Sequence, residues 1–244
     1  MQKSPLKLIR CAILLLGVGS LQSCSSTLQI PVTHSIPMLG NQGDIECSIN
    51  TAVSGLNFDA ATALTNHYFV GCNFNFASIS MYELNGGYYS KISKNGRFEL
   101  QGGFDYGNQS GGSSYDPNEG YPYWTCTFHT NFASVFAQPA LASVGKVGEI
   151  GISARLEYMG FPGFYFESVE NNPGFPPSST EVTNSWNNQL FLEPVFYCAL
   201  GFRGLKLKFQ AGVSIPIGGY GNSIGVFQAY NYGNVSIGLQ IRTF

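Results

Sequence analysis

The sequence predicts an all-β protein, a closed antiparallel up-and-down β-barrel of ten strands that spans a membrane. After residue 43, the 244-residue chain contains ten stretches in which apolar and polar residues alternate, and alternation with period two indicates strands. The gaps between these stretches are short and long in turn, as in outer-membrane barrels with tight periplasmic turns and long outward loops. Charged residues make up only 11% of the chain, against about 25% in soluble domains.

The first three predicted strands alternate most regularly. They cover residues 45–53, 56–64 and 68–76, and each places its apolar residues on one face. The opposite face carries polar residues such as Glu46 and Asp59. Side chains of successive strand residues point to opposite sides of a sheet, so each strand has one apolar and one polar face.

The next three predicted strands are less uniform. Residues 82–90 alternate weakly, whereas residues 97–106 alternate clearly after Asn95-Gly96, a strong hairpin signal. The sixth strand lies within residues 123–142, and the parity of Phe132 differs from that of Ala137. We therefore expect a phase slip on this strand, which a β-bulge would explain.

The last four predicted strands cover residues 149–158, 190–198, 205–215 and 235–242. The predicted short connections are 65–67, 91–96, 143–146 and 202–204, and the predicted long loops are 107–121, 160–188 and 216–232.

The amino end predicts export from the cytoplasm. Residues 1–23 combine basic residues with an apolar run that is too short to span a bilayer, which is typical of a signal peptide. The segment Leu21-Gln22-Ser23-Cys24 resembles the lipobox of bacterial lipoproteins, which implies an acylated Cys24; ordinary cleavage beside a small residue is the alternative. Residues 24–43, with Pro31 and Pro37, are expected to form an acylated tether, and residues 44–244 the barrel.

Alternation alone does not decide which face points outward. In lipid the apolar face must be outside, whereas a water-soluble, lipid-anchored barrel of lipocalin type would enclose it and carry an apolar ligand. We expect the membrane arrangement, because the chain has few charges and no helical span.

The polar faces would then fill the lumen with ion pairs; a narrow pore for small solutes is the alternative. The predicted lumen charges are Glu46, Asp59, Glu83, Arg97, Glu99, Asp105, Glu149, Arg155, Glu157, Glu193, Lys206, Lys208 and Arg242.

The chain resembles a family of small bacterial outer-membrane β-barrel proteins. The resemblance lies in residues 43–64, 96–107, 191–194 and 205–216 and in the ending Ile241-Arg242-Thr243-Phe244. It implies that Phe244 belongs to a signal that the barrel assembly machinery recognises. It also implies an outer-membrane location with extracellular loops and both termini in the periplasm, in contact with outer-membrane lipid.

The sequence does not predict an enzyme, a cofactor or a metal site. The spacing around His34, His67 and His129 does not assign a nucleophile and base pair. The turn Asp116-Pro117-Asn118-Glu119-Gly120 has ligand types of a calcium loop but lacks its closing Glu. The cysteines remaining in the barrel, Cys47, Cys72, Cys126 and Cys198, lack metal-site spacing and are expected to be free thiols. A net charge of −2 argues against nucleic-acid partners.

Aromatic residues in the second long loop are candidates for binding a ligand or a protein at the cell surface, because exposed apolar patches mark binding sites. An interfacial aromatic girdle is the alternative. We therefore expect a structural or surface-interaction protein without enzymatic activity. The candidate loop residues are Phe164, Tyr165, Phe166, Phe175 and Trp186.

Overall fold

The structure is a computed structural model that describes residues 34–52, 55–76, 79–115, 123–171, 178–184, 187–202, 204–219 and 233–243. Within these ranges the regular elements are all strands. They are β1 (Ile45–Ala52), β2 (Gly55–Ala63), β3 (Tyr68–Phe76), β4 (Ile79–Lys91), β5 (Gly96–Tyr115), β6 (Tyr123–Val144), β7 (Gly148–Asn171), β8 (Ser178–Asn184), β9 (Asn187–Gly201), β10 (Leu205–Val213), β11 (Ile215–Gly219) and β12 (Gly233–Thr243).

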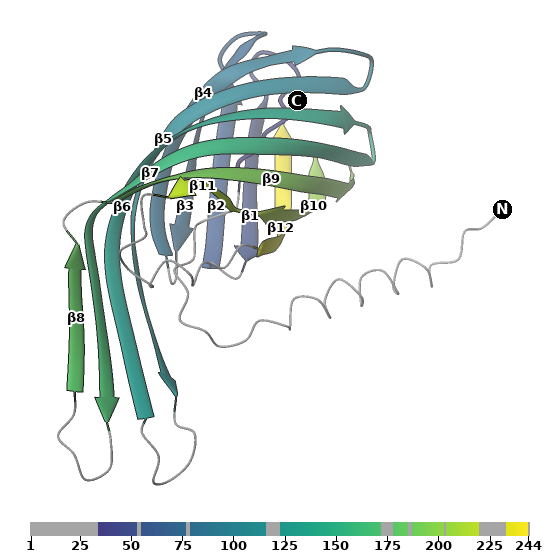
Figure 1. Ribbon diagram of the computed structural model, residues 1–244. Helices are drawn as coiled ribbons and strands as arrows, with labels where there is room; N and C mark the ends of the chain where they lie inside the picture. Colours follow the sequence, from purple (N-terminus) through teal and green to yellow (C-terminus); the bar gives the residue numbers. More distant parts are fainter. Residues whose placement is uncertain are drawn as a thin grey trace, which may run out of the picture.

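Ten of these strands close into an antiparallel barrel (Figure 1). Strands β1 to β7 pair in chain order, β7 pairs with β9, β9 with β10, β10 with β12, and β12 with β1. Strands β8 and β11 lie outside this ring, each paired with one ring strand, β7 and β9 respectively. The predicted fold class and the number of ring strands are therefore confirmed.

All four predicted short connections lie at one end of the barrel, which we call the short-turn end. Each hairpin is closed by backbone bonds, for example from Ile92 N to Gly96 O and from Phe202 N to Leu205 O. Strand β12 also ends there, where Thr243 pairs with Ile45. We call the opposite end the long-strand end.

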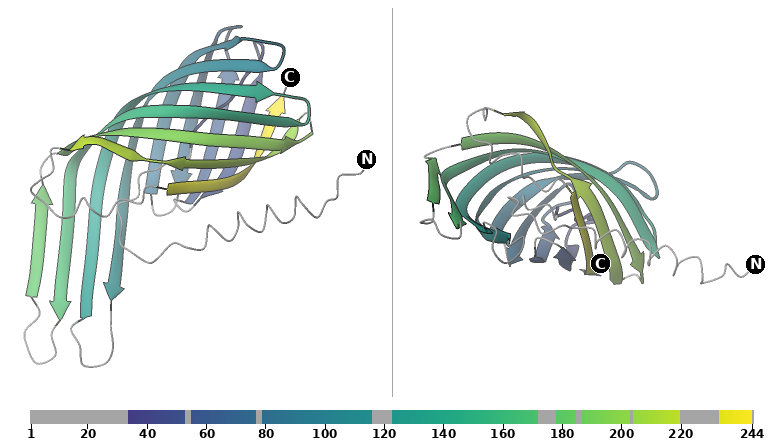
Figure 2. Two further views of the ribbon diagram at one scale, coloured as in Figure 1. Left: turned by 45° about the vertical axis from the view of Figure 1, so that its right-hand side comes forward. Right: turned by 60° about the horizontal axis from the view of Figure 1, so that its bottom comes forward.

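Strands β5, β6 and β7 continue past the ring at the long-strand end and form, with β8, a projecting sheet (Figures 1 and 2). The prediction of loops at 107–121 and 160–188 is therefore wrong for much of their length, since β5 reaches Tyr115 and β7 reaches Asn171. Pairing satisfies the backbone groups of these extensions. The extension of β5, residues 108–115, is rich in Ser and Gly and lacks hydrophobic alternation, so this part of the strand is not visible from pattern alone.

The phase slip predicted for the sixth strand is also wrong. Phe132, Phe136 and Ala140 all point inward with one continuous parity. The irregularity lies in the pairing with β7, where the register shifts between Asn131 and Ala133. The extra residue falls on β7, which bends there as a bulged strand does.

Burial alternates along the ring strands with polar residues inside and large apolar residues outside. On β1, for example, Glu46, Ser48 and Asn50 are buried, whereas Ile45 and Ile49 are exposed. This arrangement is the reverse of that in a water-soluble barrel, whose apolar residues face the interior. No helix in the described part of the chain is long and apolar enough to cross a membrane.

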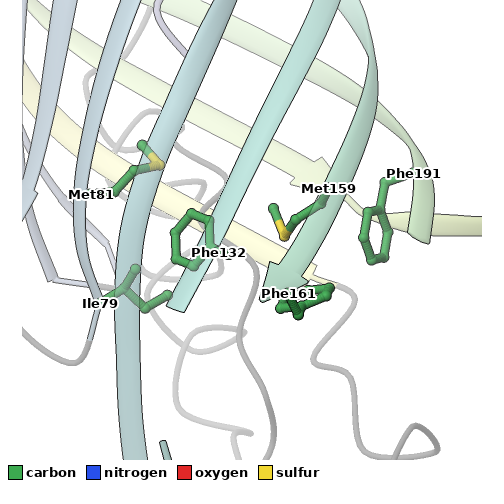
Figure 3. Packing of buried hydrophobic residues seen from close by; sticks show 6 residues of the cluster. All are labelled: Ile79, Met81, Phe132, Met159, Phe161 and Phe191. Atoms are coloured by element: carbon green, nitrogen blue, oxygen red, sulfur yellow. The ribbon is translucent and has the colours of Figure 1, made fainter. Parts of the chain in front are cut away.

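One patch of the interior is apolar (Figure 3). It comprises Ile79, Met81, Phe132, Met159, Phe161 and Phe191, on the inner faces of β4, β6, β7 and β9. Gly107 of the intervening strand β5 leaves the space for the Phe132 ring, since a Cβ there would lie 2.6 Å from Phe132 Cζ. The patch lies toward the long-strand end.

Candidate functional site

The lumen is the candidate site, because it gathers the charged side chains of the barrel. The structure buries twelve of the thirteen predicted lumen charges, with exposed fractions between 0% and 8%, whereas Arg97, near the short-turn end, is only half-buried. Buried charges require partners, and two groups of ion pairs provide many of them. They occupy different levels of the lumen.

The inner cluster lies at the short-turn end and comprises Glu46, Glu149, Lys206 and Arg242. Arg242 pairs with Glu46 and, at 2.7 Å from Nη1 to Oε1, with Glu149. Lys206 pairs with the same Glu149 carboxylate. These residues meet because β12 pairs with β1 and β10, and Glu46 lies directly opposite Arg242 in the register.

The outer cluster lies farther from the short-turn end than the inner cluster. It comprises Glu83, Asp105, Arg155, Glu157 and Glu193. Arg155 Nη2 lies 2.9 Å from Glu83 Oε2, and Nη1 lies 3.7 Å from Asp105 Oδ2. The guanidinium also lies over the Phe136 ring, 3.8 Å from its centroid. Arg155 pairs in register with Glu193, and Glu157 follows two residues along β7 on the same face.

The wall formed by β1, β2 and β3 carries a network of amide, hydroxyl and carboxyl groups. Ser48 Oγ and Asn50 Nδ2 donate to Asp59 Oδ2 at 2.7 and 2.8 Å, and Asn57 donates to Asn73. This network provides two hydrogen-bond donors to the Asp59 carboxylate.

Residues 34–39 lie inside the barrel, and we call them the luminal segment. His34, Ile36, Met38 and Leu39 are each at most 1% exposed. This location differs from the expected free tether over 24–43, of which residues 24–33 lie outside the described part of the chain. From the sequence, the few apolar residues around Pro37 are typical of a linker. Their burial becomes visible only when the barrel walls that surround them are known.

Wall side chains hold the backbone of the luminal segment. Gln101 and Gln138 both donate to Ser35 O, at 2.7 and 3.1 Å, and Gln210 donates to His34 O at 3.0 Å. Arg242 donates to Pro37 O at 3.0 Å, and Leu39 N donates to Glu99 Oε1 at 3.2 Å.

Apolar side chains of the same segment pack in two directions. Ile36 and Met38 join Ala140, Val195 and Tyr197 of β6 and β9. Leu39 joins Ala61, Ala63, Phe69 and Tyr89 on the other side of the lumen. The segment therefore contacts opposite walls and fills the space between them.

The luminal segment runs along the barrel axis. His34 Nε2 lies 2.9 Å from Glu193 Oε2, and Glu193 also accepts from Ser214, which follows the last residue of β10 at its long-strand end. Pro37 instead contacts Arg242, close to the end of β12, and Gly43 bonds to Ala63 at the β2–β3 turn. The segment thus passes from the level of the outer cluster to the short-turn end.

The other predicted residues do not form a chemical site. His67 stacks on Tyr88 at the β2–β3 turn, and His129 is exposed on β6. Cys47, Cys72 and Cys198 are free thiols. Over the described ranges, no group of three or more His, Cys, Asp or Glu side chains is placed to hold a metal ion.

The predicted binding aromatics belong to the projecting sheet or lie outside the described residues. Tyr165 lies on β7, where its hydroxyl donates to Glu167 at 3.2 Å. Phe164 and Phe166 occupy the same strand. Phe175, Trp186, Cys24, Phe244 and residues 116–120 fall outside the described residues, so their predicted roles stay predictions.

Sequence reasoning missed the luminal segment, its glutamine partners and the apolar patch. The alternation places Gln101, Gln138 and Gln210 on the inward face of their strands. It does not show their partners in the luminal segment, which are far away in the sequence. Phe132 and Phe136 share parity with Gln138, a signal that would have placed both rings inside the barrel.

No protein-family model matches the chain, and no curated protein matches it. Among solved structures, the chain is similar to one described as a KdgM porin in complex with disordered oligogalacturonate. That similarity has 9% sequence identity and a TM-score of 0.36, and it covers 82% of this chain and 99% of that chain. A likeness at this level carries no argument about family or ligand, so the barrel is established by its own strand pairing.

Proposed function

We propose that this protein is an integral outer-membrane barrel whose lumen is closed by its own luminal segment and whose projecting sheet serves a structural or surface-interaction role. One observation carries the proposal: around the closed ring, charged residues are buried inside and large apolar residues are exposed outside. A surface of this kind is stable in hydrocarbon, where only helices and closed barrels satisfy every backbone group.

The dimensions of the exposed apolar band support the membrane location. Strands β1, β2 and β10 have 8, 9 and 9 residues, and a tilted transmembrane strand needs about 9–11 residues. Exposed Tyr82 and Tyr106 are neighbours in register toward the long-strand end, and exposed Tyr68 and Tyr88 are neighbours at the short-turn end. Tyrosine is enriched at both membrane interfaces.

The same observation counts against the lipocalin-type alternative. That alternative needs the alternating apolar residues inside, to surround an apolar ligand. Leu84, Ile152 and Leu239 instead have exposed fractions of 69%, 59% and 53%. A water-soluble carrier would not leave this row of side chains in solvent.

The proposal orients the short-turn end toward the periplasm and the projecting sheet toward the outside, because outer-membrane barrels have short periplasmic turns. Acylation of Cys24 and recognition of Phe244 by the barrel assembly machinery are parts of this proposal. The residues between 24 and 34 span at most about 35 Å when extended. The proposal assigns no enzymatic activity.

The first test uses full-length protein with Cys24→Ala, since an acyl chain alone would hold either kind of barrel on a membrane. We expect the protein to need detergent for solubility and to migrate differently on SDS gels before and after boiling. Solubility without detergent and a single gel position would overturn the proposal.

A second test introduces a charge on the exposed face. Leu84→Arg places a cation in the middle of the apolar band and should cost about 2–4 kcal/mol in the free energy of unfolding from lipid. Ile92→Arg is the matched control, because Ile92 is similarly exposed, at 61%, but lies in a turn at the short-turn end. Urea unfolding in lipid vesicles measures both, and equal costs would count against the membrane span.

A further inference from the structure

The lumen is wider than its own wall side chains can fill. Barrels of eight strands are just filled by side chains, whereas those of sixteen leave an aqueous channel. Here ten strands enclose an additional extended peptide, the luminal segment. An extended chain occupies about 5 by 10 Å in cross-section, from the spacings between strands and between sheets. Its removal would leave a passage of about that size.

The segment is held by noncovalent contacts alone: hydrogen bonds to its backbone, the contact of His34 with Glu193, and the packing of Ile36, Met38 and Leu39. Five hydrogen bonds join wall side chains to its backbone. Three of these come from the neutral amides of Gln101, Gln138 and Gln210. Water can replace such partners at low cost, because the net contribution of a neutral hydrogen bond is only about 0.5–1.5 kcal/mol.

The passage would carry an excess of acids at the level of the outer cluster. Glu83, Asp105, Glu157 and Glu193 surround a single guanidinium, that of Arg155. Glu157 Oε2 and Asp105 Oδ1 are buried and have no hydrogen-bond partner among the described residues. These two oxygens are therefore available to a cation that enters the lumen.

We propose that the lumen is a latent pathway for small monovalent cations and that the luminal segment is its removable plug. When the segment leaves, water enters, and hydration favours the charged form of the carboxyl groups. Rings of carboxylates select cations. The outer cluster thereby sets the selectivity, whereas the inner level contains three cations, Lys206, Lys208 and Arg242, among its acids. This inference rests on the proposed membrane-spanning barrel.

The test measures ionic current through single proteins in a planar bilayer under a tenfold KCl gradient. The unaltered protein should carry no current. A variant lacking residues 25–40, so that Asn41 follows Cys24, should carry stepwise current. Its reversal potential should shift toward the K⁺ limit, which is about 59 mV for a tenfold gradient.

A second variant keeps the whole chain during folding. Gly40-Asn41-Gln42, where Asn41 and Gln42 are exposed at the short-turn end, is replaced by a specific protease site and cut after insertion. Urea then removes the fragment, which mass spectrometry checks. A matched control carries the same protease site at Gly145-Lys146, a turn that does not hold the segment, and should stay closed after cutting.

Selectivity is tested in the variant lacking residues 25–40. Glu157→Gln should move the reversal potential toward zero, and Glu167→Gln, on the same strand in the projecting sheet, should leave it unchanged. The barrels without the segment must still show the heat-dependent gel shift. If such barrels carry no current or select anions, this inference is overturned, whereas the proposal of a membrane-spanning barrel still stands. Loss of that shift in the unaltered protein overturns the proposed function itself.

Discussion

The two ionic levels of the lumen arise from the same alternation of residues but differ in charge balance. At the inner level, three buried cations, Lys206, Lys208 and Arg242, lie among the acids Glu46, Asp59, Glu99 and Glu149. In the outer cluster, Arg155 alone serves four carboxyl groups. Loss of one cation therefore leaves other cations at the inner level and none in the outer cluster.

The two levels also hold the luminal segment differently. Arg242 contacts it directly through Pro37 O. Arg155 acts through Gln138, whose Oε1 accepts from Arg155 Nε at 2.8 Å while its amide nitrogen donates to Ser35 O. The inner level thus holds the segment by a charged donor, whereas Arg155 of the outer cluster holds it through a neutral amide, and Glu193 of the same cluster contacts His34 directly.

The largest effect should follow from removing the single outer cation. Arg155→Ala leaves Glu83 and Asp105 without their buried partner, and breaking a buried pair in this way costs about 3–5 kcal/mol. Urea unfolding in lipid vesicles measures the loss. Arg97→Ala, at the short-turn end and bonded only to Gly96 O among described contacts, is the control. A loss below 1 kcal/mol for Arg155→Ala would show that the outer acids do not need their cation.

A smaller effect should follow from removing the inner arginine. Arg242→Ala leaves Lys206 paired with Glu149 and Lys208 buried nearby, so we expect a loss of about 1–3 kcal/mol, the cost of unsatisfied partners. The same unfolding measurement checks this value. A loss equal to that of Arg155→Ala would remove the proposed difference between the two levels.

The sequence predicted the barrel wall well, because local alternation determines both strand and face. Parity alone placed residues as distant as Glu46 and Arg242 on the polar face, and both are buried. The structure supplies what parity cannot, namely which of these side chains meet across the lumen. Those contacts depend on strand tilt and closure, which no local pattern encodes.

The luminal segment was missed for a different physical reason. Its residues Ile36, Met38 and Leu39 are apolar but do not alternate as a strand, and Pro37 interrupts them. Their burial comes from walls that form far away in the sequence, on β2, β6 and β9. Similarly, the phase slip was predicted because Phe132 differs in parity from Ala137, whereas Phe132 packs in the apolar patch inside the lumen.

The smallest predicted effect concerns the relay between the outer cluster and the plug. Gln138→Ala removes one bond to Ser35 O, which Gln101 still holds, and one acceptor for Arg155. A cost of about 1 kcal/mol corresponds to about a fivefold increase in the fraction of time that the plug is displaced. Brief openings in planar bilayers measure that fraction. Gln240→Ala is the control, since Gln240 is equally buried but has no described bond to the segment. Equal opening frequencies in the two variants would mean that the Gln138 amide does not help to hold the plug, which the remaining contacts, such as His34 with Glu193 and Arg242 with Pro37 O, would then hold.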